Sequence, residues 1–452
     1  MKIHFIAIGG SAMHNLAIAL HKKGEQVSGS DDEIFEPSLS RLSEYGLLPE
    51  KTGWDPSGIS RELDVVIAGM HARSDNPELL RAQDLGIKIY SFPEFLFEHS
   101  REKTRIVIGG SHGKTTITSM ILHVLTHCGI DTDYMVGAQL EGFEVMVKLS
   151  DDAALMVMEG DEYPSAPTDP RPKFHIYRPH IAVLSGISWD HINVFKTPED
   201  YIEQFRIFLD KIEENGLLIY SEDDDTVNEL CTSSAKPSLR LKPYGLPEYD
   251  IRQGITFAEN KGKHYKLNFF GKHNLLNMNA ARLVVKHLGV TDSMFFDSIS
   301  TFRGASKRMQ VMLDGKYNTV IRDFAHAPSK VRATLEAVRE RFPGRKIIAC
   351  LELHTYSSLN RDFLDQYRGS LDKADEAIVF FSPEAVKIKR LNMLDPDDIR
   401  RGFRNQRIRV VNNKEELSGE LEKAGGNKTC YIFMSSGTFG GFNTDVFQKK
   451  LT

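Results

Sequence analysis

The stretch IVIGGSHGKTTITSM, residues 106–120, decides how the rest of the chain is interpreted. A short apolar run ends at two glycines, a Gly-Lys-Thr-Thr follows, and a helical pattern then begins. In a phosphate-binding loop, glycines let consecutive backbone N–H groups point into one concavity, and the start of the following helix favours anions. Lys114 would reach the terminal phosphates of a nucleotide, and Thr115 would offer its hydroxyl to Mg²⁺. The stretch therefore predicts a nucleotide-binding strand–loop–helix unit.

The loop departs from the strict pattern G-x-x-x-x-G-K-[ST], which needs a glycine at the position of Ile108. A glycine-rich turn with a surface lysine is the simpler alternative. The strand predicted before the loop and the helix predicted after it favour the nucleotide interpretation.

Strand–helix units recur along the chain and predict an α/β fold. Residues 2–10 are apolar and end in glycines, and residues 11–24 follow with helical spacing. Further units begin at residue 104 and near residue 309. This alternation predicts parallel sheets with helices on both faces, in three domains. We expect residues 231–265 to be less regular, because they hold several Pro and Gly.

Composition excludes several classes of protein. The 452 residues are 41% hydrophobic and 26% charged, with a net charge of −5, so nothing global indicates a nucleic-acid partner. The four cysteines lie far apart and predict no disulfide framework, as expected in a reducing cytosol. No apolar run predicts a signal peptide or a membrane span. We therefore expect a cytoplasmic protein without membrane insertion, a monomer or a weak homodimer.

Acidic side chains follow two predicted strands of the central block. Glu159 ends one apolar run, and Asp190 and His191 follow the next. Carboxyl ends of parallel strands meet at one sheet edge, where acids often hold a metal beside phosphates. Glu159, His191 and Thr115 therefore predict a Mg²⁺ site, although His is an unusual ligand for Mg²⁺. A surface acidic loop and a structural histidine are the alternatives.

The N-terminal block has the general layout of a nucleotide site. A glycine turn at residues 8–13 precedes a helix start, and Asp31 follows some 20 positions later. Asp31 would face a ribose or base. The turn is not a full G-x-G-x-x-G, so alone it is weak evidence.

With these residues in view, the chain resembles the Mur ligase family, the ATP-dependent enzymes of bacterial cell-wall (peptidoglycan) precursor synthesis. The motifs that carry the resemblance are GSHGKTT (110–116), EGDEY (159–163), DH (190–191), GKHNLLN (271–277), Arg308 and DFAHAPS (323–329). The family's loop also lacks the early glycine, which explains Ile108. Ala327 stands where the family has a second histidine.

The resemblance implies three domains, with ATP and Mg²⁺ as cofactors. A Rossmann-like domain at 1–100 would bind a UDP substrate, a central domain at 101–308 would bind ATP, and a Rossmann-like domain at 309–452 would bind the incoming amine. ATP would activate a substrate carboxylate as an acyl phosphate, which the amine attacks. We expect hinges near residues 100 and 308.

The resemblance also assigns residues to roles. The catalytic residues would be Lys114, Glu159, His191 and Arg308, and the metal ligands Thr115, Glu159 and His191. The ATP-binding residues would be Gly110, Ser111, His112, Gly113, Lys114, Thr115, Thr116, His273, Asn274, Asn277, Arg308 and Asp323. The UDP-substrate residues would be Gly9, Gly10, Ser11, Met13, Ser30, Asp31 and His71, of which His71 is equally well a loop histidine. The candidates for the amine site are His326, Ser329, His354 and Ser435, for which structural roles also compete.

Within the family, residues 160–184, 323–329 and 434–442 favour the branch that joins UDP-N-acetylmuramate to the recycled tripeptide L-alanyl-γ-D-glutamyl-meso-diaminopimelate. The His-x-Tyr within ELHTYSSLN (352–360) instead resembles the branch that joins UDP-N-acetylmuramate to L-alanine. Two other classes stay open, a kinase that uses the same loop and a non-catalytic nucleotide-binding regulator. The intact Lys114, Glu159 and His191 argue against the regulator.

Overall fold

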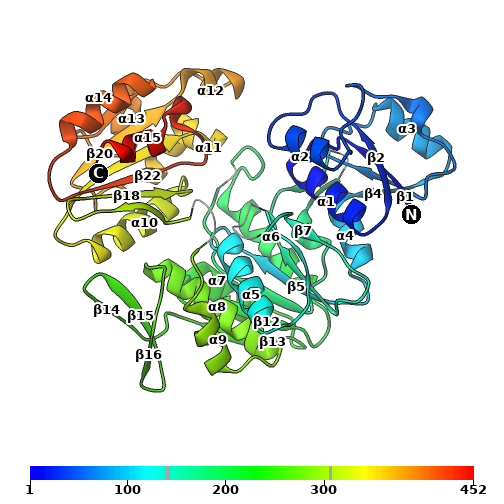
Figure 1. Cartoon of the computed structure of the whole chain (residues 1–452), viewed down its shortest axis with the longest axis horizontal. Helices are drawn as coiled ribbons and strands as arrows, with labels where there is room; N and C mark the ends of the chain where they lie inside the picture. Colours follow the sequence, from blue (N-terminus) through cyan, green and yellow to red (C-terminus); the bar gives the residue numbers. More distant parts are fainter. Residues whose placement is uncertain (138–142, 168, 191, 305–307, 452) are drawn as a thin grey trace.

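The computed structural model describes residues 1–137, 143–167, 169–190, 192–304 and 308–451, and Figure 1 shows three α/β units in chain order. The predicted metal ligand His191 lies outside the described residues. None of the helices in the described ranges is long and apolar enough to cross a membrane.

The first unit is a parallel sheet in the order β2-β1-β3-β4, as the strand–helix pattern predicts. Its strands are β1 (Lys2–Ile6), β2 (Gln26–Ser30), β3 (Val65–Ala68) and β4 (Lys88–Ser91). Its helices are α1 (Ser11–Lys22), α2 (Ser38–Glu44), the 3₁₀ turn η1 (Pro56–Gly58), α3 (Pro77–Asp84) and α4 (Phe92–His99).

The central unit is a seven-stranded sheet in the order β13-β12-β11-β5-β8-β6-β7, parallel except for the edge strand β7. Its strands are β5 (Thr104–Gly109), β6 (Asp133–Met135), β7 (Val147–Lys148), β8 (Leu155–Glu159), β11 (Ile181–Leu184), β12 (Leu217–Ser221) and β13 (Arg240–Tyr244). Its helices are α5 (Lys114–His127), α6 (Pro198–Asp210), α7 (Asp225–Ser234), α8 (Lys272–His287) and α9 (Asp292–Ile299).

Both faces of the central sheet are covered, and β5 shows how the sequence achieves this. Ile106 and Ile108 belong to the apolar cluster that contains residues of α5 and α8. Val107, between them, belongs to the cluster that contains residues of α6. Alternate side chains of a strand point to opposite faces, so a continuous apolar run fits a strand buried on both sides.

The central unit also carries antiparallel additions that the sequence pattern did not predict. Residues 231–265, expected to be irregular, hold most of a three-stranded sheet in the order β14-β15-β16. Two-residue turns connect these short strands and account for Gly254 and Gly262, each at positive φ. The added strands and turn are β9 (Pro164–Ala166), β10 (Asp169–Pro172), η2 (Lys173–His175), β14 (Tyr249–Arg252), β15 (Ile255–Asn260) and β16 (Lys263–Lys266).

The third unit is a six-stranded sheet in the order β17-β18-β22-β19-β20-β21, in which only the edge strand β17 is antiparallel. Its strands are β17 (Gln310–Asp314), β18 (Asn318–Asp323), β19 (Lys346–Leu353), β20 (Glu376–Phe381), β21 (Arg409–Val411) and β22 (Thr429–Met434). Its helices are α10 (Pro328–Arg341), α11 (Tyr356–Leu359), η3 (Arg361–Tyr367), α12 (Pro383–Ile388), α13 (Pro396–Gly402), α14 (Lys414–Ala424), η4 (Phe439–Gly441) and α15 (Thr444–Lys449).

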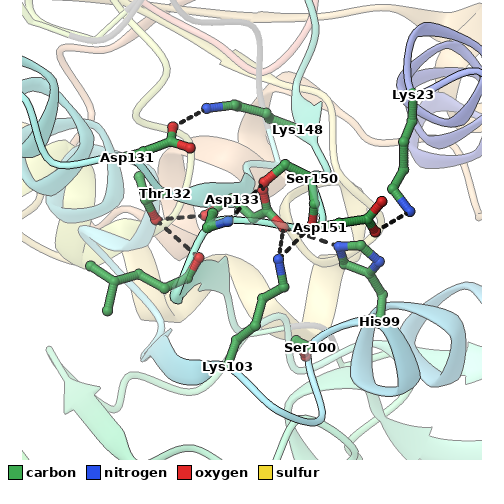
Figure 2. Close-up of polar contacts among 12 residues, drawn as sticks. Lys23, His99, Ser100, Lys103, Asp131, Thr132, Asp133, Lys148, Ser150 and Asp151 are labelled. Atoms are coloured by element: carbon green, nitrogen blue, oxygen red, sulfur yellow. Dashed lines mark hydrogen bonds and ion pairs between the residues drawn. The ribbon is translucent and has the colours of Figure 1, made fainter.

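A group of polar side chains around the buried Asp133 joins the first unit to the central one, and we call Asp133, His99, Lys103 and Ser150 the Asp133 cluster (Figure 2). Oδ2 of Asp133 lies 3.0 Å from Nε2 of His99 at the end of α4, and 2.7 Å from Nζ of Lys103. The Ser150 hydroxyl donates to Oδ1 of Asp133 at 2.8 Å. Burial alone would raise the pKa of Asp133, but these hydrogen bonds outweigh it and lower the pKa.

Apolar contacts strengthen the same junction. One cluster runs from Phe95 and Leu96 of α4 to Val107 and Met156 of the central sheet. Between the same two units, the backbone N–H of Met146 donates to Oδ1 of Asn15 in α1 at 3.1 Å, and both residues are buried. The first junction is therefore closed by contacts within the protein itself.

Candidate nucleotide-binding and ligase site

The glycine loop between β5 and α5 has the conformation that its sequence predicts. Gly110 has φ +128° and Gly113 has φ +75°, and Gly113 is the residue that precedes α5. These are backbone conformations that L side chains rarely adopt. A Cβ at Gly113 would also lie only 2.2 Å from Oδ1 of Asn277, so α8 packs directly against the loop.

Lys114 at the start of α5 is held across the loop by two oxygen atoms. Its Nζ donates to the carbonyl of Gly110 at 2.7 Å and to Oε2 of Glu162 at 2.6 Å. Burial opposes the charge, but the carboxylates of Glu162, Asp161 and Glu159 outweigh it and raise the pKa of Lys114. The lysine is therefore a charged, oriented donor beside the loop.

Thr115 and Glu159 meet where α5 begins and β8 ends. The Thr115 hydroxyl donates to Oε1 of Glu159 at 2.8 Å, and Oε2 accepts the backbone N–H of Gly137 at 2.9 Å. A hydroxyl and a carboxylate are the hard oxygen donors that suit Mg²⁺, so these two residues fit the predicted metal site. Asp190, which precedes the undescribed His191, is buried.

A cavity of about 230 Å³ lies beside the loop, between the central and third units. Residues predicted for ATP and for the amine line it together: His112, Gly113, Thr116, His273, Asn274, Asn277, Arg308, Asp323 and Ser329. The sequence motifs, which are spread over more than 200 residues of the chain, therefore converge on one space. The lining residues that motif analysis missed include Ser185, Ser221, Asp223, Asp224, Lys330 and Thr334.

Asp323, at the end of β18, orders the third-unit side of this cavity. Its carboxylate accepts the backbone N–H of Met309 at 3.0 Å and the Thr334 hydroxyl at 2.6 Å. The adjacent Arg308 guanidinium lies over the Phe324 ring, 4.4 Å from its centroid. Burial lowers the pKa of Arg308, while the charges of Asp323 and Glu159 oppose that shift.

The third unit touches the glycine loop through Ser329, in the first turn of α10. The Ser329 hydroxyl lies 3.3 Å from Nε2 of His112 and 3.2 Å from the Ser188 hydroxyl. Burial lowers the pKa of His112 to about 3, with a further contribution from Lys330, so the ring is neutral at pH 7. The start of α10 and the loop therefore form one side of the site.

The four candidates for the amine site form two groups. His354 and Ser435 follow the neighbouring strands β19 and β22 and meet at Glu352, which motif analysis missed. The Ser435 hydroxyl donates to Glu352, and Nδ1 of His354 lies 3.8 Å from Oε1 of that carboxylate.

His326 lies in the segment between β18 and α10, three residues before Ser329, and is not among the described residues that line the cavity. Its Nδ1 is 2.8 Å from the carbonyl of Phe324, and burial lowers its pKa to about 3. Among the described residues no hydrogen bond joins the two groups, and all four residues remain candidates for the amine site.

The residues predicted for the UDP substrate surround the loop after β1. Asp31 is buried, and its Oδ2 accepts the backbone N–H of Gly9 at 2.7 Å. Nδ1 of His71 lies 3.6 Å from Oδ1 of Asp31 and 3.5 Å from Oδ1 of Asp32. Asp31 therefore also orders the loop, while the more exposed Asp32 lines a pocket of about 490 Å³ with His71.

The other predicted residues of this loop have mixed environments. Gly10 is the residue before α1, and Ser11 is the first residue of this helix and is exposed. Met13 is buried in the core. The Ser30 hydroxyl donates to the buried carboxylate of Glu78. The ligand atoms of Asp31, Asp32 and His71 lie within 4.8 Å of one another, so this group could also hold a cation.

Three family models match the chain in succession. They are described as "Mur ligase family, catalytic domain" over residues 2–104, "Mur ligase middle domain" over 108–285 and "Mur ligase, glutamate ligase domain" over 307–437. Together they span most of the three α/β units.

Curated relatives match over most of their length. A UDP-N-acetylmuramate–L-alanine ligase from Persephonella marina is 35% identical over 364 residues, which are 78% of this chain and 76% of the relative. An enzyme of the same name from Lactobacillus acidophilus is 28% identical over 468 residues, covering 100% of this chain and 99% of the relative.

Solved structures of two ligases share the fold at 22% identity. A UDP-N-acetylmuramate-alanine ligase from Thermotoga maritima superposes with a TM-score of 0.69 over 100% of both chains. A murein peptide ligase from Psychrobacter arcticus superposes with a TM-score of 0.68 over 99% of this chain and 98% of its own. At this identity the likeness shows the three-domain fold alone.

Proposed function

The chain belongs to the Mur ligase family of ATP-dependent enzymes that form an amide bond, and on that premise we propose that it joins UDP-N-acetylmuramate to L-alanine. The observation that carries the proposal is the 35% identity to a relative with that activity in its name, over 76% of the relative's length. The His-x-Tyr at residues 354–356 agrees with it.

The comparisons support the alternative, L-alanine, better than the expectation that the tripeptide is the incoming amine. The tripeptide is supported by the sequence of residues 160–184, 323–329 and 434–442. It is also supported by the fold likeness to a murein peptide ligase, at 22% identity. L-alanine has the better support, because relatives at higher identity carry it in their names. Membership of a family of amide-forming enzymes also replaces the kinase and regulator alternatives.

The chemistry begins with an inert carboxylate. An oxygen of the substrate carboxylate would attack the γ-phosphorus of ATP, the bond to the bridging oxygen would break, and ADP would leave. The amine nitrogen would then attack the acyl carbon, and phosphate would depart as the nitrogen loses a proton. Such reactions depend mainly on positioning and on neutralising negative charge.

Residues of this chain supply both requirements. The backbone of the glycine loop and the Lys114 ammonium would bind the phosphates, with Lys114 turning from Glu162 to the nucleotide. Thr115 and Glu159 would hold Mg²⁺, which supplies charge neutralisation at the phosphates when bound. Arg308 would bring a further positive charge from the side of the third unit, and His273, Asn274 and Asn277 would contact the nucleoside.

The test is phosphate release by the full chain with ATP, Mg²⁺ and UDP-N-acetylmuramate, with L-alanine, the tripeptide or no amine added. The proposal predicts turnover that depends on L-alanine and a product whose mass equals the two substrates minus water. Turnover with the tripeptide alone would restore the first expectation. Turnover without any amine would contradict amide formation.

A further inference from the structure

One cation that lines the nucleotide cavity belongs to none of the motifs. Lys330 follows DFAHAPS and lies in the first turn of α10, half-buried, on the same cavity as Gly113, Thr116 and Arg308. In the part of the chain that the structure describes, its ammonium makes no hydrogen bond or ion pair. The established motifs of the site therefore leave it without a role.

The neighbouring cations Lys114 and Arg308, unlike Lys330, each contact a partner among the described residues of the protein. Lys114 pairs with Glu162 at 2.6 Å, and Arg308 lies over the Phe324 ring. Burying a charge without a partner is costly. Burial therefore lowers the pKa of Lys330 to about 8. The positive charges of Lys114 and Arg308 contribute to this lowering, and the negative charge of Asp190 opposes the shift. Lys330 is still mostly protonated at pH 7, so an anion in this cavity would gain from contact with it.

The surroundings indicate which anion this is. Ser329, the residue before Lys330, touches His112 of the phosphate loop at 3.3 Å, and Lys114 is among the charges that act on Lys330. Glu352, His354 and Ser435, the other group of amine-site candidates, do not line this cavity within the described ranges. A phosphate of the nucleotide fits this position better than the carboxylate of an amino acid does.

We propose that Lys330 binds the terminal phosphate of ATP from the third domain, while Lys114 binds the phosphates from the central domain. The nucleotide then ties α10 to the glycine loop. The start of α10, a helix of 14 residues, adds a favourable dipole for the same anion. This inference rests on the proposed function only because it requires ATP to bind in this cavity. It does not depend on which amine the enzyme uses.

The test compares binding of a non-hydrolysable ATP analogue and of ADP, both with Mg²⁺, to the full chain and three variants. Lys330→Met should weaken the triphosphate analogue by about 10-fold or more, as for loss of a hydrogen bond to a charged group. ADP affinity should change by less than about 3-fold, because ADP lacks the contacted phosphate. Lys330→Arg should restore most of the difference. Arg332→Met removes an exposed cation from the same helix and should change neither affinity.

Three results would overturn the proposal. Equal losses for ADP and the analogue would mean that Lys330 only supports the structure of the cavity. Unchanged affinity for both would mean that it contacts no phosphate. An effect confined to the KM of the amine would assign Lys330 to the carboxylate of that substrate. If L-alanine were not the amine, the nucleotide affinities would be unaffected, so the two proposals fail separately.

Discussion

The two junctions of this chain handle charge in opposite ways. At the first junction, Asp133 and Lys103 are buried, and Asp133 contacts both Lys103 and His99, so the charges of this cluster have partners within the protein. At the second, Arg308 and Lys330 line a cavity, and Lys330 has no partner among the described residues. A junction with satisfied charges can be rigid without a ligand, whereas one with an unsatisfied charge gains stability when an anion binds. We therefore expect closure to occur near residue 308 rather than near residue 100.

The largest expected effect is on stability at the first junction. Asp133→Asn leaves the Lys103 ammonium buried without its counter-charge, and breaking a buried pair in this way costs about 3–5 kcal/mol. Chemical denaturation should show this loss, while the folded variant keeps its kcat. Asp131→Asn is the matched control, because Asp131 is exposed and its pair with Lys148 should contribute less than about 1 kcal/mol. Equal effects of both variants would contradict a special role for the Asp133 cluster.

The second prediction concerns catalysis at the glycine loop. Lys114→Ala should lower kcat by about 10²–10³-fold, because phosphate charge then goes uncompensated. Lys148→Ala, which removes a partly exposed lysine from the edge strand β7 of the same unit, should leave kcat unchanged. Steady-state phosphate release measures both. A near-normal rate for Lys114→Ala would show that the phosphates bind elsewhere.

Measuring the free energy of unfolding over a pH series tests whether the ionised carboxylate of Asp133 stabilises the first junction. The lowered pKa of Asp133 means that its contribution to stability is present above the ordinary aspartate value of 3.8 and is lost as pH falls through the lower folded-state pKa. The stability difference between the wild type and Asp133→Asn should therefore be largest near neutral pH and shrink below about pH 3.8. A difference that stays constant to pH 2 would mean that the ionised carboxylate is not what stabilises the junction.

The smallest expected effect is at the contact between α10 and the loop. Ser329→Ala removes the hydroxyl that lies near His112 and Ser188, and a neutral hydrogen bond contributes about 0.5–1.5 kcal/mol. We expect a decrease in kcat of about 10-fold at most, with the ADP affinity unchanged. A loss as large as that of Lys114→Ala would instead place Ser329 among the residues that contact the reacting groups.

The features that could be predicted from the sequence are those that short segments encode. The glycine loop, Lys114 and the strand ends of Glu159 and Asp323 are each specified by neighbours in the chain. The N-terminal cap of α6 is equally local, because the Thr197 hydroxyl accepts the N–H of Asp200, three residues along the chain, at 3.1 Å. Local patterns of glycine, apolar residues and capping side chains are enough for these.

The features that were missed depend on contacts between distant segments. Asp133 lies in no motif, and only the fold brings it to His99 and Lys103. The pairing of Lys114 with Glu162 spans 48 residues and joins the segments that follow β5 and β8, two strands that are neighbours in the sheet. Glu352 gains its significance because β19 and β22 are adjacent, an order that the sequence does not reveal. The predicted domain boundaries near 100 and 308 lie where one sheet gives way to the next, and they remain predictions.

The most direct measurement of the central claim is hydrogen exchange of the full chain with and without a non-hydrolysable ATP analogue and Mg²⁺. The account predicts that the analogue protects the glycine loop at 110–116 and the start of α10 at 326–334, while α4 and β6 around the Asp133 cluster exchange at the same rate in both states. Protection confined to the first junction, with α10 and the loop unchanged, would contradict it.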